Sequence, residues 1–184
     1  CAYFHDIGKL KNPEYFIENQ GPDGNPHDAM TPSMSALVVI SHVKDGVDLA
    51  LKHRLNARII DVIEQHHGNS LVYFFYRRAL DQKKEIIRLV EQDKAREDDV
   101  PDVTEEGFRY PGPKPQSKET AMVMLADSVE AVVRASKDRS HERIDELVDG
   151  VINERVTEGQ LDECDLTLRD LRTVAESFKA TLRG

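Results

Sequence analysis

The chain has 184 residues, of which 39% are hydrophobic and 32% are charged, and its formal net charge is −9. This length suffices for one domain with a substantial core. The acidic balance argues against broad nucleic-acid binding, which requires a basic surface. It still allows an anionic small substrate, because a metal cluster or a few lysines can create a local positive site.

The ends and the cysteines limit the class of protein further. Two isolated cysteines, Cys1 and Cys164, do not form a disulfide framework, so we expect a reducing compartment. No run of about 20 apolar residues predicts a membrane span, and no signal peptide is present. The chain begins inside an apolar run without a Met, which indicates a fragment. We predict a single domain over residues 1–184.

The first 31 residues predict the end of a helix and then a long loop. Residues 1–9 resemble the last turns of a helix that Gly8 ends near its C-cap. Residues 10–31 are rich in Pro, Gly, Asn and Asp, and a loop of this length is usually functional or mobile. We expect the apolar insert at 15–17 to pack as an anchor. His27 is expected at the surface or on the substrate side, not as a metal ligand.

Three helices are predicted next. Thr31 as N-cap and Pro32 at the first position start a helix that runs to about residue 53. Its middle is apolar nearly all round, which predicts a central position. Asn56 starts a helix over about 57–67 that Gly68 closes. A third helix is predicted over about 70–95, aromatic at its start and charged later.

The remaining chain predicts a loop and three more helices. Residues 96–118 combine an acidic cluster with three prolines and predict a mobile loop. Ser117 starts a helix to about residue 137, and Ser140 and Thr167 are predicted N-caps of helices at about 141–157 and 168–182. The helix that Ser117 starts has a predicted apolar stripe made of Met122, Leu125, Val129, Val132 and Val133. Ala121, Val123, Met124, Ala126 and Ala131 are predicted to widen that stripe. No segment has a strand pattern, so we predict an all-α orthogonal bundle.

Two candidate ligands are adjacent at the start of the chain. His5 and Asp6 are both good ligands for a divalent metal when deprotonated. An adjacent His-Asp pair also occurs by chance in many chains, so the pair needs partners elsewhere. His42 lies inside the predicted central apolar helix, where a histidine bonded within the core is the alternative.

Three more candidates follow. His66 and His67 end an amphipathic helix, where a favourable interaction with the helix dipole is the alternative interpretation. Asp127 is embedded in an apolar sequence, and a buried carboxylate there needs a cation or several donors. A salt bridge to an Arg is the alternative for Asp127. Mixed His and carboxylate ligands suit Fe, Mn, Zn, Co or Ni better than Ca or Mg, and the absence of thiolates argues against a structural zinc site.

The order His-Asp, His, His-His, Asp on predicted helices resembles the HD-domain metal-dependent phosphohydrolases. More closely, the sequences at 5–10, 15–20, 25–28, 41–46, 63–68 and 126–131 resemble the cytoplasmic HD domain of the seven-transmembrane HD family. The resemblance covers roughly residues 1–135, and the last two helices match loosely. It implies the HD orthogonal helical bundle and hydrolysis of cyclic di-AMP to the linear dinucleotide pApA. The Gly-Tyr-Pro signature of the cyclic di-GMP-cleaving subfamily does not follow the His-His doublet.

The resemblance also implies a two-metal site, with Fe or Mn expected and Co, Ni or Zn possible. It assigns Asp6 as the bridging carboxylate and a catalytic residue. It further assigns His5 and Asp127 as ligands of one metal, and His42, His66 and His67 as ligands of the other. A further His that the family carries upstream has no counterpart in this chain.

The implied mechanism is attack on phosphorus, in line with the 3′-oxygen, by a hydroxide held between the two metals. Lys9 is predicted to contact a phosphate oxygen and assist catalysis, with a solvated lysine as the alternative. Lys44 and Asp45 are both predicted either to contact substrate or to orient ligands. The aromatic run at 73–76 could stack on adenine, but such a run is more often core.

Two other functions remain open from the sequence. One is an HD nucleotidase acting on mononucleotides, which commonly needs one metal and no His-His doublet. The other is a nucleotide-sensing HD module that binds without turnover, which the intact set of ligand types disfavours. By resemblance, we expect a cyclic dinucleotide as the partner, no nucleic-acid polymer, and a membrane-anchored longer protein whose cytoplasmic part is this chain. The oligomeric state is not predicted.

Overall fold

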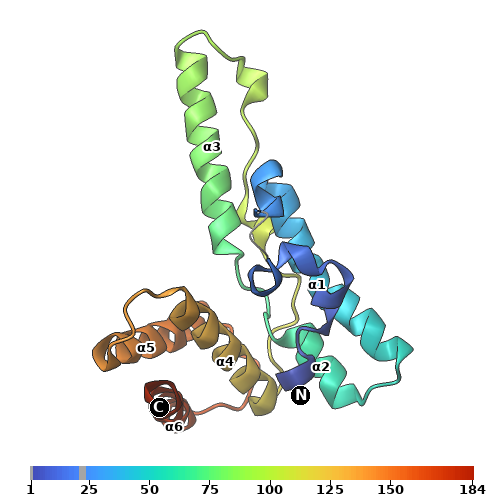
Figure 1. The fold of residues 1–184 in the computed structure, drawn as a ribbon, viewed down its shortest axis with the longest axis vertical. Coiled ribbons are helices and arrows are strands. Elements are labelled where there is room, and N and C mark those ends of the chain that lie inside the picture. Colours follow the sequence, from blue (N-terminus) through green and yellow to red (C-terminus); the bar gives the residue numbers. More distant parts are fainter. Residues whose placement is uncertain (1, 21–23) are drawn as a thin grey trace. The chain divides into compact units, whose positions relative to one another are not determined.

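The computed structural model describes residues 2–20 and 24–184 and shows helices joined by turns (Figure 1). Within these residues the only β-type pairing is an isolated bridge between Leu71 and Arg109, so the prediction of an all-α fold is confirmed. Cys1 lies outside the described residues. The chain forms two compact units, and whether they make the predicted single domain stays a prediction. Unit 1 comprises residues 1–5, 50–70 and 111–184, and unit 2 comprises residues 6–49 and 71–110.

Two long helices, α1 (Pro32–Lys52) and α3 (Tyr73–Glu91), make up much of unit 2. The predicted N-cap of α1 is confirmed, because Thr31 Oγ1 accepts the Met34 N–H at 3.3 Å. The small core of unit 2 contains Ala36 of α1, Phe75 and Ala79 of α3, and Phe108.

The aromatic run at the start of α3 divides between core and surface. Phe75 is buried, whereas Tyr73 and Phe74 are 61% and 68% exposed. The helix begins at Tyr73 instead of residue 70, because Leu71 pairs with Arg109 and the Val72 N–H donates to the Phe108 carbonyl at 2.8 Å. It also ends earlier than predicted, at Glu91. The prediction that such a run is mostly core therefore holds for only part of it.

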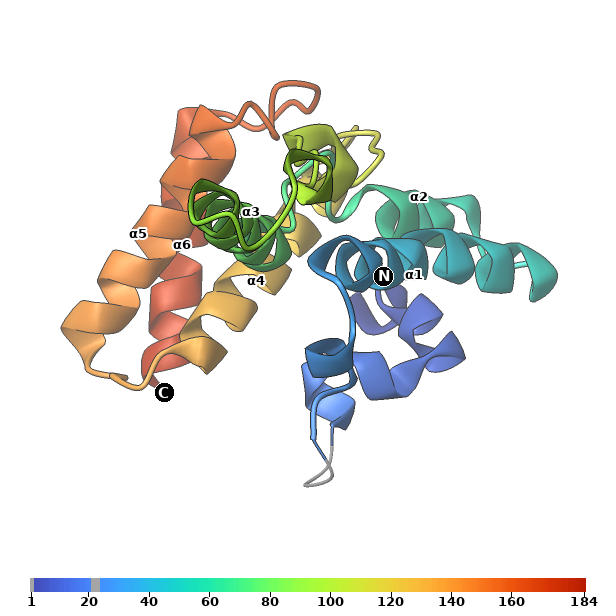
Figure 2. The same cartoon turned by 90° about the horizontal axis from the view of Figure 1, so that it is seen from above.

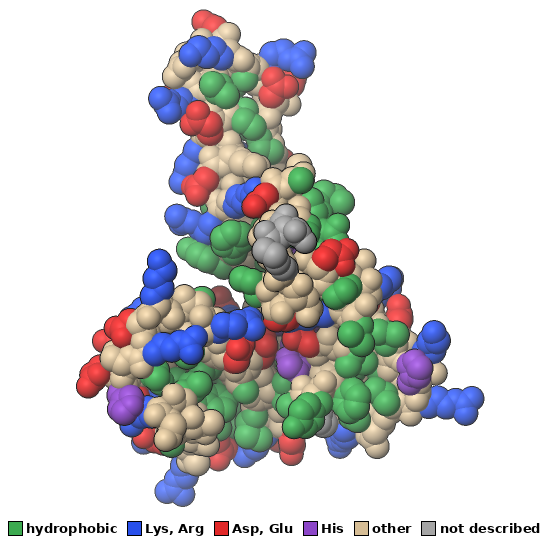
Figure 3. Space-filling model, in the orientation of Figure 1, with side chains coloured by type: hydrophobic (Ala, Val, Ile, Leu, Met, Phe, Trp, Pro, Cys, Tyr) green, Lys and Arg blue, Asp and Glu red, His purple; other side chains and the backbone are tan. Residues whose placement is uncertain are grey.

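The segment after α3 returns beside that helix (Figure 1). It contains two short 3-10 helices, η6 (Glu97–Asp99) and η7 (Glu105–Phe108), and the latter places Phe108 in the core at 3% exposure. Figure 3 shows acidic and basic side chains interspersed along the exposed part of α3. The predicted loop therefore has a buried aromatic anchor, and its mobility stays a prediction.

Short 3-10 helices replace the predicted helix end and loop at the start of the chain. These are η1 (Ala2–Phe4), η2 (Ile7–Lys11), η3 (Pro13–Tyr15), η4 (Ile17–Asn19) and η5 (Pro26–Ala29). The predicted C-cap role of Gly8 is wrong. Gly8 lies inside η2, and an added Cβ would overlap the His42 carbonyl of α1 and lie 2.5 Å from the Gly46 nitrogen. Glycine is needed there for close backbone approach.

The predictions for the first loop are mixed. Phe16 is buried and anchors the segment, but its neighbour Ile17 is 71% exposed. The expectation that His27 lies at the surface is wrong, because its side chain is 4% exposed. The His27 ring packs against Tyr15 and Phe75, and its Nε2 bonds the Tyr15 carbonyl at 2.9 Å. The Arg78 side chain donates a hydrogen bond to the backbone carbonyl of His27.

The described part of unit 1 contains four whole α-helices, and Figure 2 shows three of them, α4, α5 and α6, side by side. The four are α2 (Ala57–Gln65), α4 (Lys118–Ala135), α5 (His141–Thr157) and α6 (Leu168–Arg183). The four predicted N-caps are confirmed, since each side chain accepts a backbone N–H of the first turn; they are Asn56, Ser117, Ser140 and Thr167. The helix α2 ends at Gln65, so the His-His doublet lies in the turn that follows.

The core of unit 1 lies among α4, α5 and α6 and includes Leu125, Val129, Val148 and Leu171. The predicted stripe of α4 is partly wrong, because Met122 and Val132 are 40% and 38% exposed. Of the residues predicted to widen the stripe, Ala121 and Met124 are buried, whereas Ala126 and Ala131 are exposed. Among the described residues, no helix combines the length and the hydropathy that a membrane span requires.

Candidate metal centre

The doublet His66–His67 occupies the turn after α2 in unit 1. The His66 side chain is 1% exposed, and its Nδ1 lies 2.8 Å from the Ile63 carbonyl oxygen. A carbonyl oxygen only accepts hydrogen bonds, so Nδ1 carries a hydrogen, and in the neutral ring the lone pair is then on Nε2. The two rings are tilted, with centroids 4.0 Å apart. The turn therefore presents two imidazoles close together, one with its tautomer fixed.

His5 and Asp127 join the doublet within the same unit. His5 Nε2 lies 3.5 Å from Asp127 Oδ1, and His67 Nδ1 lies 3.9 Å from Asp127 Oδ2. The His5 ring meets the His66 ring edge-on, with centroids 5.0 Å apart. His5 Nδ1 is 2.5 Å from the Ala2 carbonyl oxygen, so Nδ1 donates there and Nε2 is the nitrogen that faces Asp127. We call these four residues, His5, His66, His67 and Asp127, the histidine cluster.

Unit 2 contains the other two predicted ligands. His42 on α1 is 2% exposed, and its Nε2 lies 3.3 Å from Asp6 Oδ1. Its Nδ1 is 2.5 Å from the Val39 carbonyl oxygen, and its ring meets the rings of Phe16 and Tyr110 edge-on. The alternative of a core histidine is thus half right, since one ring nitrogen bonds within the core and the other faces a carboxylate. Asp6 follows His5 directly in the chain, at the N-cap position of η2.

The predicted substrate lysine, Lys9, pairs with two carboxylates of unit 2. Its Nζ lies 2.6 Å from Asp6 Oδ2 and 2.8 Å from Glu18 Oε1. Burial lowers the pKa of Lys9, but the charge of Asp6 and the hydrogen bonds to Asp6 and Glu18 outweigh burial, so the pKa lies above its ordinary value. Lys9 is therefore not the solvated lysine of the alternative interpretation. Glu18 was missed by the sequence interpretation, although it lies in one of the quoted motifs.

The two further predicted residues of α1 differ in environment. Lys44 is exposed, and its contact with a substrate stays a prediction. Asp45 is 8% exposed and accepts a hydrogen bond from Lys11 Nζ at 2.6 Å. Asp45 thus ties η2 to α1 within unit 2, which fits an orienting role better than a substrate contact.

The chemistry of these donors fits a divalent transition metal. Imidazole nitrogens and carboxylate oxygens are the ligand types that Fe, Mn, Co, Ni and Zn accept in proteins. Metal-bound histidines usually bond their second nitrogen to a carbonyl or carboxylate, which fixes the ring and its tautomer. His5, His42 and His66 all bond a backbone carbonyl through Nδ1. These histidines are therefore held by the kind of carbonyl bond that orients metal-bound histidines.

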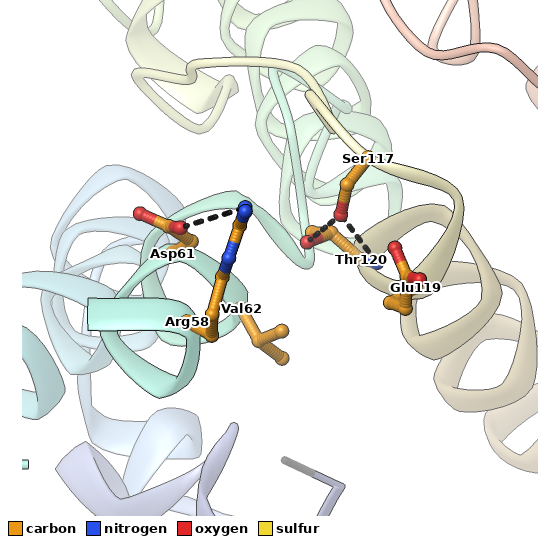
Figure 4. A pocket seen from close by; sticks show the side chains of 6 residues that line it. All are labelled: Arg58, Asp61, Val62, Ser117, Glu119 and Thr120. Carbon is orange, nitrogen blue, oxygen red and sulfur yellow. Dashed lines mark hydrogen bonds and ion pairs between the residues drawn. The ribbon is translucent and has the colours of Figure 1, made fainter. Parts of the chain in front are cut away.

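A separate cavity of about 360 Å³ lies in unit 1, between the first turns of α2 and α4 (Figure 4). Its charged side chains include an ion pair, with Arg58 NH1 3.9 Å from Asp61 Oδ2. Ser117, the N-cap of α4, bonds Thr120 at 3.1 Å. None of the predicted ligands lines this cavity. We therefore do not assign the metal centre to it.

The chain is similar in sequence to a known family and to known proteins. The family model of the HD domain matches residues 1–132. The chain is 45% identical over its whole length to the cyclic-di-AMP phosphodiesterase PgpH of Bacillus subtilis (strain 168). It is 41% identical over its whole length to the protein of the same name from Listeria monocytogenes serotype 1/2a (strain 10403S). The chain spans 23% of the length of each relative.

The fold also matches a solved structure. This is the crystal structure of the L. monocytogenes phosphodiesterase PgpH HD domain in complex with cyclic-di-AMP. The TM-score is 0.87 at 40% sequence identity, and the match covers 99% of this chain and 77% of the other. At that identity the likeness extends beyond the general fold to the sequence.

Proposed function

The chain belongs to the HD-domain family, and from that premise we propose that it is a metal-dependent phosphodiesterase that hydrolyses cyclic di-AMP to pApA. The observation that carries the proposal is the match, over 99% of this chain, to an HD domain solved with cyclic-di-AMP. HD domains bind divalent metals, and a cluster of His and Asp side chains is present in unit 1. The activity remains a proposal because the curated relatives are much longer than this chain.

We propose that the six ligand-type residues hold two divalent metals, Fe or Mn in the first place. Asp6 would be shared, His5 and Asp127 would hold one metal, and the remaining three histidines, His42, His66 and His67, the other. The support is the family order of the residues together with the contacts inside each unit. Bound divalent metals lower the pKa of water toward neutrality and neutralise negative charge on a phosphate.

The protein's own residues orient and hold charge around the reacting phosphodiester. The carbonyl bonds at Nδ1 of His5, His42 and His66 fix each ring and leave Nε2 as the nitrogen that would bind a metal. Lys9 would neutralise a phosphate oxygen as a point charge. Glu18 holds the Lys9 ammonium at 2.8 Å in the structure and so limits where that charge can go. Lys44 would supply a second cation from α1.

We also propose that this chain is the cytoplasmic part of a longer, membrane-anchored protein. The support is the resemblance to the seven-transmembrane HD family and the greater length of the curated relatives. Fractionation of cells that express the natural protein tests this, since the activity is expected in the membrane pellet. Activity found only in the soluble fraction would contradict the anchor and leave the catalytic proposal standing.

The catalytic proposal is tested by incubating the purified protein with Mn²⁺ and cyclic di-AMP and separating the products by chromatography. We expect pApA from the wild type and a loss on the order of 10³-fold in Asp6→Asn, because a shared metal ligand supports several kcal/mol of transition-state stabilisation. Asp28→Asn is the matched control, since Asp28 lies in η5 outside the ligand set. Binding without any pApA would favour a sensing module, and one metal per chain would favour a mononucleotidase.

A further inference from the structure

A buried amide from the C-terminal part of unit 1 holds the turn that carries the His-His doublet. This amide is Gln160, between α5 and α6, which is 1% exposed. Its Nε2 donates to Asn69 Oδ1 at 2.8 Å, and its Oε1 accepts the Asn69 backbone N–H at 3.2 Å. The two residues are 91 positions apart in the sequence. One side chain thus makes paired hydrogen bonds to a residue two positions after His67.

The turn between His67 and Asn69 leaves little freedom for other arrangements. Gly68 has a φ of +53°, in the left-handed region, and an added Cβ would press on Gln160 Oε1. Ser70 closes the turn from the other side, since both its N–H and its hydroxyl donate to the His67 carbonyl, at 3.1 Å and 2.7 Å. The backbone carrying the doublet is therefore held by hydrogen bonds directly after the imidazoles.

The buried amide of Gln160 lies beside the apolar core of unit 1. Leu161, the next residue, already belongs to the core of unit 1. A buried amide is costly unless its donor and acceptor are both paired, and Asn69 pairs both. Gln160 also lies beyond residue 132, where the match to the HD family model ends. Its placement is thus a feature of this chain's C-terminal segment and not of the family's ligand motifs.

We propose that Gln160 is a positioning residue of the metal centre, which acts through Asn69 to fix the turn that orients His66 and His67. The proposal rests on the proposed function, because it takes the doublet to be metal ligands. Outer groups that orient metal ligands typically change metal affinity by about 10–100-fold when they are removed. Gln160 touches neither metal nor substrate in this assignment, so its effect reaches them only through the backbone of the turn.

The test measures Mn²⁺ affinity by competition with a chelating dye, which needs no turnover. We expect Gln160→Met to fold and to weaken Mn²⁺ binding by about 10–100-fold, because methionine keeps the apolar bulk and removes both hydrogen bonds. Asn69→Ala is expected to weaken binding less, because it removes the bond to Oδ1 and keeps the bond from the Asn69 backbone N–H. The double variant should be little worse than Gln160→Met alone, since that change already removes both bonds.

A matched control separates positioning from general stability. Val148→Ala removes a fully buried side chain of α5 in the same unit without touching the turn. It is expected to lower the melting temperature at least as much as Gln160→Met while leaving Mn²⁺ affinity within about twofold of the wild type.

Three results would overturn the assignment. One is wild-type Mn²⁺ affinity in folded Gln160→Met, and another is an equal loss of affinity in Val148→Ala. Either would leave the proposed function standing. The third, no metal binding by the wild type, would remove the metal centre itself and with it the role of Gln160. Wild-type metal binding without hydrolysis of cyclic di-AMP would contradict only the proposed reaction.

Discussion

The two units hold their candidate ligands by different physical means. In unit 1 the His-His doublet lies in a turn closed by neutral hydrogen bonds from Ser70 and Gln160. In unit 2, Asp6 is paired with the Lys9 ammonium, which Glu18 also contacts, and Gly8 packs directly on the backbone of α1. Neutral bonds are insensitive to salt, whereas ion pairs between half-buried groups are weakened by it, though less than fully exposed pairs are. We therefore expect the two regions to respond differently to the same perturbations.

The largest expected effect is at the close backbone contact of unit 2. Gly8→Ala places a Cβ against the His42 carbonyl and the Gly46 nitrogen, and neither backbone atom can move without shifting α1. We expect a loss of about 2–4 kcal/mol in the free energy of unfolding, measured by urea denaturation. Gly150→Ala in α5 is the control, since its added Cβ meets nothing within 4 Å. That control should gain about 0.5–1 kcal/mol from helix propensity.

A smaller effect is expected from the corresponding change in unit 1. Gly68→Ala forces a residue with a side chain into the left-handed region, which costs about 1–2 kcal/mol. The nearest atoms are the ends of the Gln160 and Met124 side chains, which can shift. Urea denaturation measures the loss in the free energy of unfolding for both variants. An equal loss in Gly68→Ala and Gly8→Ala would contradict the difference between the units, because the turn would then be enclosed by rigid atoms.

The dependence of stability on salt distinguishes the ion pairs of unit 2 from the neutral hydrogen bonds of unit 1. In metal-free buffer of low ionic strength, we expect both Lys9→Met and Asn69→Ala to lower the melting temperature by about 2–4 °C. At high salt the deficit of Lys9→Met should shrink, because the ion pairs that it removes are already screened in the wild type. The deficit of Asn69→Ala should persist. An equal salt response of both variants in calorimetry would refute the distinction.

The smallest effect expected is a pH response at the surface of unit 1, away from the doublet. Lys118 and the capping bonds of Thr167 lower the pKa of Asp170 to about 2 from its ordinary value of 3.8. A lowered acid pKa stabilises the fold fully above about pH 4, and this contribution is lost as the pH falls toward 2. Asp170→Asn should lower the melting temperature by about 1–3 °C at pH 6 and make no difference near pH 2. A deficit that persisted at pH 2 would show that packing, and not charge, is responsible.

Regular helices and their caps could be predicted from the sequence, because each depends on local periodicity and a capping side chain. Thr31, Asn56 and Thr167 all accept the predicted bonds. The three histidines bonded through Nδ1 were also found, since their order resembles a family with the same ligand order. Lys9 was found for the same reason, although its second partner, Glu18, was not.

Other parts depend on contacts that local sequence does not encode. Gly8 follows an apolar turn, as the glycine at a helix C-cap does. Only its contact with the α1 backbone shows that it is needed for close packing. His27 follows Asn25-Pro26 in a polar loop, yet the turn at η5 rotates its ring onto Tyr15 and Phe75. Gln160 lies in an acidic segment and carries no signal, because its partner is 91 positions away.

The packing of α4 has a consequence for where this protein can be cut. A chain that ended near residue 135 would still contain every proposed ligand and the whole segment that the HD model matches. It would also expose Leu125, Val129 and Val133, which α5 and α6 help to cover. Contiguous apolar surface of this kind promotes aggregation. The smallest soluble unit is therefore longer than the family motif, and its boundary is set by the apolar face of a helix instead of by the ligands.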